Sequence, residues 1–162
     1  TLNTLRNEYA LGVPVRHYTE VFAGLIRDGA LAPASLGMRA TYHDPCYLSR
    51  YNDVIEAPRE LLTAIGCEVV EMPRNGKNSF CCGAGGGRIC MYDSALTERP
   101  SENRIREALT LDVELFVVSC PKDFTMYTDA AKTVGCEARL RVVDIAQLLD
   151  QALHPVAVAV GR

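Results

Sequence analysis

Two adjacent thiols, Cys81 and Cys82, stand directly before a run of glycines in the stretch SFCCGAGGGR, residues 79–88. Neighbouring cysteines cannot form an unstrained disulfide with each other, because the bridge prefers Cα atoms about 4.4–6.8 Å apart. They are also poor core residues, since successive side chains on a strand point to opposite faces. The remaining explanations are metal ligation, redox chemistry or chance.

Two further cysteines flank this pair at a distance: Cys46 closes the stretch HDPC (43–46), and Cys120 lies in SCP (119–121). The chain has seven cysteines in 162 residues. That number is odd, and the chain is long enough to bury a core, so a secreted disulfide scaffold is not expected. Reduced thiols indicate metal or redox work in a cytoplasmic protein.

The composition is that of an ordinary globular chain, with 48% hydrophobic and 23% charged residues. The net charge is −3 and Lys and Arg are scattered, so the sequence carries no electrostatic footprint for nucleic acid. No apolar run approaches the roughly 20 residues of a membrane helix. No signal-peptide pattern opens the chain. We therefore expect no transmembrane segment.

Strand-like and helix-like stretches alternate from residue 39 onward. The predicted strands are 39–43, 67–72 (as a buried strand), 113–120 and 139–143. One predicted helix begins at Pro58 and stops at Gly66, and a second follows the glycine run to Leu96. Three more cover residues 102–111, with Ser101 as the cap, 123–134 and 144–153. This alternation predicts an α/β, Rossmann-like fold with a mainly parallel sheet and helices on both faces.

Ligands of such sheets bind beyond the carboxyl ends of the strands. Cys46, the Cys81–Cys82 pair and Cys120 each lie at the end of a predicted strand or in the loop after it. The topology therefore predicts one site at this edge, built from three distant stretches of the chain.

Residues 1–31 and 123–153 echo one another, since each reads as helix, strand, helix and ends in Ala-Leu. We interpret residues 1–37 as the tail of a preceding, missing repeat packed on the domain, and residues 38–162 as the cysteine-rich domain. Chance similarity between two helix–strand–helix segments is the alternative.

The stretches HDPC, CCGAGGGR and SCP together resemble the cysteine-rich CCG domain found in heterodisulfide reductases and in the iron–sulfur subunits of glycolate, lactate and glycerol-3-phosphate oxidoreductases. The resemblance covers about residues 39–153. It implies a [4Fe–4S] cluster, cubane or noncubane, held by four residues called the site cysteines below: Cys46, Cys81, Cys82 and Cys120. The family motif ends in C-x-x-C, and here its last position is Asp123. That carboxylate is expected either to contact the cluster or to cap the helix it opens.

The glycine run suits an anionic cluster. Glycines at 83, 85, 86 and 87 allow φ > 0 and can turn backbone N–H groups toward cluster sulfurs, and we single out Gly83, Gly85 and Gly86 as cofactor-binding. A helix N-terminus after the glycine run and another after Pro121 would add positive electrostatic potential at the cluster. A nucleotide loop is disfavoured, because Arg88 stands where the dinucleotide fingerprint needs Gly or Ala and the P-loop Lys-Ser/Thr is missing.

Other candidates are weaker. We count His43 among the cofactor-binding candidates, in a second layer behind the ligands; the alternative is that it simply closes a strand. Cys67 and Cys136 are expected in the core, and Cys90 as a structural residue of the helix after the glycines. His17 and His154 are expected at the surface.

The resemblance implies an iron–sulfur electron-transfer domain of an oxidoreductase, of the heterodisulfide reductase or flavin-linked hydroxy-acid oxidase kind. Its partner would be a flavoprotein or ferredoxin-type subunit or domain. A thiol, disulfide or 2-hydroxy acid would react through the complex rather than with this part alone. The alternative is a structural zinc domain that serves as an interaction module with the same cysteine ligands.

Overall fold

The computed structural model describes residues 2–9, 11–91 and 97–155. The α-helices are α1 (Leu2–Asn7), α2 (Tyr18–Arg27), α3 (Cys46–Asn52), α4 (Glu56–Ala64), α5 (Pro100–Ala108), α6 (Pro121–Val134) and α7 (Ile145–Leu153). The strands are β1 (Arg39–Tyr42), β2 (Glu68–Val69), β3 (Leu115–Val118) and β4 (Arg141–Asp144). Two 3-10 helices are η1 (Gly76–Asn78) and η2 (Gly85–Cys90).

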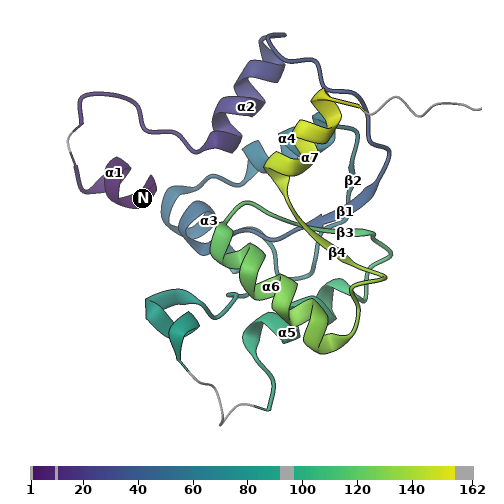
Figure 1. The fold of residues 1–162 in the computed structure, drawn as a ribbon. Helices are drawn as coiled ribbons and strands as arrows, with labels where there is room; N and C mark the ends of the chain where they lie inside the picture. Colours follow the sequence, from purple (N-terminus) through teal and green to yellow (C-terminus); the bar gives the residue numbers. More distant parts are fainter. Residues whose placement is uncertain (1, 10, 92–96, 156–162) are drawn as a thin grey trace, which may run out of the picture.

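The strands form one parallel sheet in the order β2-β1-β3-β4. Ala40 pairs with Leu115, and Val117 pairs with Val143. Helices α2, α4 and α7 lie on one side of the sheet, and α5 and α6 on the other (Figure 1). The predicted α/β fold with helices on both faces is confirmed.

The central strand β3 serves two cores. All four of its residues are buried, and they alternate between the sheet faces as a strand requires. Leu115 and Val117 join the core with α4 and α7, whereas Phe116 and Val118 join the core with α5 and α6. This burial on both faces explains the unbroken apolar run of the sequence.

Two predicted helix boundaries are confirmed in detail. Helix α4 ends just before Gly66, whose φ is +72° and whose missing Cβ would lie 1.9 Å from Ser35 Oγ. Only glycine fits there. Helix α7 begins at the N-cap Asp144, whose carboxylate accepts a hydrogen bond of 2.8 Å from the Ala146 N–H.

Three predicted elements differ from the structure. The buried strand 67–72 reduces to β2, a two-residue edge strand with Glu68 exposed. Ser101 does not cap α5: Pro100 occupies the first helical position, where its missing N–H costs nothing, and Arg99 is the N-cap. No α-helix follows the glycines up to residue 91, because Gly86 and Gly87 adopt φ of +62° and +80° inside η2. Residues 92–96 of that prediction lie outside the described residues.

The helix–strand–helix pattern predicted for residues 1–31 is only partly present. Helices α1 and α2 form, but between them the described residues contain no strand. Pro14 lacks an N–H, and the Val15 carbonyl accepts hydrogen bonds of 3.0 and 2.8 Å from the Arg6 guanidinium. Helix α2 packs against α4, with Tyr18, Phe22 and Ile26 against the first core.

Candidate metal centre

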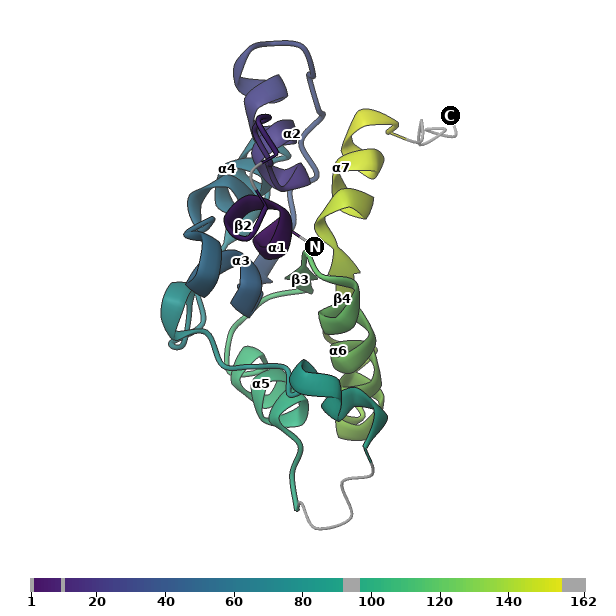
Figure 2. The same cartoon turned by 90° about the vertical axis from the view of Figure 1, so that its left-hand side faces the viewer.

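The three cysteine stretches lie around the carboxyl edge of the sheet, which faces the viewer in Figure 2. Neighbouring strands β1 and β3 lead to Cys46, in the first turn of α3, and to Cys120, the N-cap of α6. The Cys81–Cys82 pair lies on the irregular segment between η1 and η2. Helix α3, which no sequence pattern predicted, starts from Pro45 of HDPC and so begins at a site cysteine.

The site cysteines share one electrostatic environment. Burial raises the pKa of the Cys46 thiol, and Cys81 and Asp123 raise it further. Burial likewise raises the pKa of Cys82, together with Asp123, and that of Cys120, together with Asp123 and Cys46. Without a cation, these neighbours oppose ionisation of the Cys46, Cys82 and Cys120 thiols. Because metals bind thiolates, a cationic metal centre would supply the missing compensation.

Backbone amides point at the sulfurs. The Gly83 N–H donates to Cys81 Sγ over 3.4 Å. Amides of Tyr47 and Ala84 lower the pKa values of Cys46 and Cys82, and those of Lys122 and Asp123, in the first turn of α6, lower that of Cys120. Such N–H groups are the hydrogen bonds that tune cluster potentials.

Asp123 is not a helix cap. It is the third residue of α6, with Cys120 as the N-cap, and no side chain caps this helix. Its side chain is buried, and burial raises its pKa to about 6, while hydrogen bonding with Cys82 and Cys120 lowers it. Its Oδ2 has no hydrogen-bond partner among the described residues. The capping interpretation is therefore wrong, and the carboxylate lies beside the thiols.

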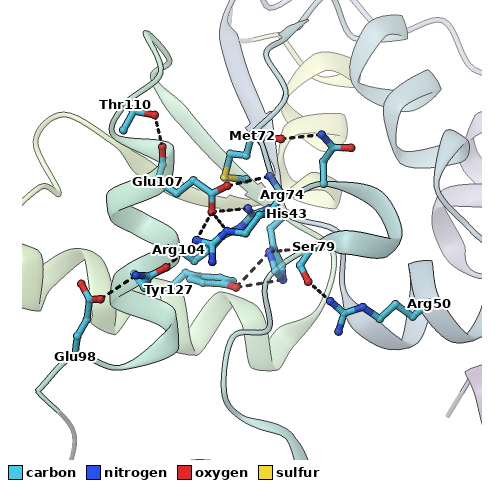
Figure 3. Close-up of polar contacts among 12 residues, drawn as sticks. His43, Arg50, Met72, Arg74, Ser79, Glu98, Arg104, Glu107, Thr110 and Tyr127 are labelled. Carbon is cyan, nitrogen blue, oxygen red and sulfur yellow. Dashed lines mark hydrogen bonds and ion pairs between the residues drawn. The ribbon is translucent and has the colours of Figure 1, made fainter.

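His43 lies behind this carboxylate. Its Nε2 is 3.6 Å from Asp123 Oδ2, and the Tyr127 hydroxyl is 3.2 Å from each ring nitrogen (Figure 3). Burial, aided by the charges of Arg104 and Arg50, lowers the pKa of His43 well below its usual value. His43 directly follows β1 and is buried between the sheet and α6, so its place in a second layer behind the ligands stays a prediction.

Hydrogen bonds from two charged side chains, Asp44 of the HDPC stretch and Arg50 of α3, join this part of the chain to the segment that leads to Cys81. The Asp44 carboxylate binds Arg59 through hydrogen bonds of 2.8 and 3.0 Å and accepts the Gly76 N–H at 2.7 Å. Arg50 of α3 donates to Lys77 O at 2.7 Å and to Ser79 O. Neither Asp44 nor Arg50 was expected from the sequence to support the site, although Asp44 lies within the HDPC motif.

The remaining candidates fall outside the site. Cys67 and Cys136 lie in the two cores, as expected. Cys90 is exposed at the end of η2, so its expected structural place is wrong. His154 is exposed as expected, whereas His17 is half-buried and accepts the Thr19 N–H as the N-cap of α2.

The donor set fits an iron–sulfur cluster: four thiols from three stretches, amide donors on the sulfurs, and a buried carboxylate oxygen that accepts no hydrogen bond in the described structure. Within the described part of the chain, no three His, Cys, Asp or Glu side chains converge closely enough to hold a single metal ion. In the same residues, no helix is both long and apolar enough to span a bilayer.

Comparison with known proteins points the same way. The family model described as "CCG: Cysteine-rich domain" matches residues 40–126. The EtfAB:quinone oxidoreductase of Syntrophomonas wolfei is 37% identical over 93% of this chain and 22% of its own length. The probable iron-sulfur-binding oxidoreductase FadF of Bacillus subtilis is 38% identical over 99% of this chain and 23% of its own.

A third relative is one of the subunits of the dihydromethanophenazine:CoB–CoM heterodisulfide reductase of Methanosarcina acetivorans, which is 36% identical over 86% of this chain and 34% of its own length. The chain thus spans between a fifth and about a third of these relatives. No solved structure matches it.

Proposed function

The chain belongs to the CCG cysteine-rich domain family, and from this premise we propose that it binds an iron–sulfur cluster through the site cysteines and transfers electrons within a larger oxidoreductase. We further propose that the cluster is a [4Fe–4S] cluster. The observation that supports the proposal is the placement of all four cysteines, with amide N–H groups beside them, at the carboxyl edge of the parallel sheet, where they interact electrostatically with one another or with Asp123.

The chain's own residues would have distinct tasks. The site cysteines would hold the cluster as thiolates, and the amides of Gly83, Lys122 and Asp123 would stabilise the negative charge on their sulfurs. When bound, the cluster would supply one-electron redox chemistry. Asp44 and Arg50 would fix the position of the segment that leads to Cys81 relative to Cys46, through their hydrogen bonds to Gly76 and Ser79.

The names of the relatives support a proposal about the electron partners. Their names include an EtfAB:quinone oxidoreductase and a subunit of a heterodisulfide reductase. We therefore propose that a flavoprotein or ferredoxin-type subunit or domain exchanges electrons with this domain, and that a thiol, disulfide or 2-hydroxy acid reacts elsewhere in the complex. Reduced thiols at the site suit a cytoplasmic location.

The test is purification under strict anaerobiosis, with iron, acid-labile sulfide and zinc quantified in the same sample. Brown protein with iron and sulfide in comparable amounts is expected, and EPR of the reduced protein would identify the cluster type. Colourless protein with stoichiometric zinc would refute the proposal and identify a zinc domain instead.

A further inference from the structure

Arg104 is a fully buried cation on α5, with a side-chain exposure of 0%. Its Nη1 donates to Glu107 Oε2 at 2.9 Å, but its Nε and Nη2 are buried and have no hydrogen-bond partner within the described residues. A buried charge with unused donors is costly unless it is compensated. A cation held at this cost invites a functional explanation.

The partner carboxylate is shared. Glu107 also accepts hydrogen bonds from Arg74, at 2.8 Å from Nε and 3.0 Å from the backbone N–H (Figure 3). Burial raises the pKa of Glu107, but its bonds to Arg74 and Arg104 outweigh this and lower it, so the group is a carboxylate at neutral pH. One negative charge thus faces two guanidinium groups, which leaves a net positive charge.

Helix α5, which carries Arg104 and Glu107, packs against the CCG segment. Pro100, in the first turn of α5, lies under Gly83, whose missing Cβ would be 3.1 Å from the proline ring. Ile105 and Ala108 share a core with Cys82. In Figure 3, Arg104 runs alongside Tyr127, the residue that contacts His43.

The Tyr127 hydroxyl lies in the electrostatic field of both Arg104 and Cys82. Burial raises the pKa of its hydroxyl, Asp123 and Cys82 raise it further, and Arg104 lowers it. The field of the guanidinium and that of the Cys82 sulfur therefore meet at one buried hydroxyl. Charges in this interior are weakly screened by salt.

We propose that Arg104 raises the reduction potential of the cluster through its incompletely compensated buried charge, and that Glu107 limits the effect. This inference rests on the proposed function. Reduction adds one electron to the cluster, so a nearby cation favours the reduced form and a nearby carboxylate disfavours it. Arg104 is thus a tuning residue that need not touch the cluster.

The experiment is an anaerobic redox titration of the purified protein, followed by visible absorbance and EPR, on four variants. We expect Arg104→Gln to lower the midpoint potential and Arg104→Lys to keep it near that of the wild type. Glu107→Gln, which preserves shape and retains Arg104, should raise it. Arg106→Gln is the matched control, because this exposed arginine of the same helix pairs with Glu98 at 3.0 Å and its removal changes the net charge equally.

Opposite shifts from Arg104→Gln and Glu107→Gln would support the proposal, since general damage to packing has no reason to change sign. If Arg104→Gln does not fold, the Glu107→Gln titration decides alone. An intact cluster whose potential changes no more in these variants than in Arg106→Gln would overturn the role of Arg104 and leave the proposed function standing. Wild-type protein without iron and sulfide would overturn both.

Discussion

The chemistry of single residues at this site is dominated by thiols that do not ionise readily alone. Burial and mutual repulsion raise the pKa values of Cys46, Cys82 and Cys120, and only a few amides oppose this. Thiolates therefore become favourable when a cation joins them. Each of the four should then be needed, because losing one thiolate removes one bond to the metal and some of the negative charge that holds it.

We expect replacement of any one site cysteine by serine to abolish or cripple cluster binding, read as loss of visible absorbance and of iron per chain. Cys67→Ala and Cys136→Ala are the controls, since both side chains are buried in the cores. These two changes should retain the cluster and cost about 1–3 kcal/mol of stability. If Cys67→Ala loses the metal while Cys46→Ser keeps it, the ligand assignment is wrong.

Asp123 is expected to influence the cluster directly. Because it does not cap α6, Asp123→Ala should not show the cost of about 0.5–2 kcal/mol that is typical of a lost N-cap. Instead, removing a carboxylate that touches Cys82 and Cys120 should shift the visible or EPR spectrum of the bound cluster. Asp129→Ala, on the exposed side of the same helix, is the control. An unchanged spectrum in Asp123→Ala would show that the carboxylate is a bystander.

At the scale of elements, the glycine segment offers a matched pair of substitutions. Gly83 has φ of +85° and lies against Pro100, whereas Gly85 is exposed, has no positive φ, and a Cβ there would meet nothing within 4 Å. Gly83→Ala should therefore destabilise the segment by about 1–3 kcal/mol and weaken cluster retention. Gly85→Ala should stay within about 0.5 kcal/mol of the wild type. Thermal unfolding and iron content measure both, and equal effects would contradict the structure.

The sequence predicted helices and strands best where a single local pattern determines the structure. The two-sided apolar run of β3 and the stop at Gly66 were unambiguous, and parallel topology then required Cys46 and Cys120 to meet. Prediction from the sequence failed where contacts between elements determine the structure: the sequence of β2 does not indicate that this strand lies at the edge of the sheet. Likewise Asp123 and Ser101 look like N-caps, but Pro121 and Pro100 begin those helices first. No local pattern marks Arg104 as buried.

At the scale of the whole molecule, the chain covers a fifth to a third of its relatives. We expect this chain to hold a cluster but to turn over no disulfide or 2-hydroxy acid when an artificial electron carrier is supplied. A polypeptide extended to the length of the relatives should be active in the same assay. Steady turnover by the 162-residue chain alone would mean that this one site is a complete enzyme.

The site cysteines divide between two kinds of support, and this bears on how a cluster would be lost in the cell. Cys46 and Cys120 follow the two central strands, whose buried residues pack on both faces. Cys81 and Cys82 follow an edge strand through a long irregular segment. The packed sheet would hold Cys46 and Cys120 in place whether or not a cluster is bound. The positions of Cys81 and Cys82 would depend more on the bonds to the cluster itself, so loss of iron in the cell should expose this pair before the other.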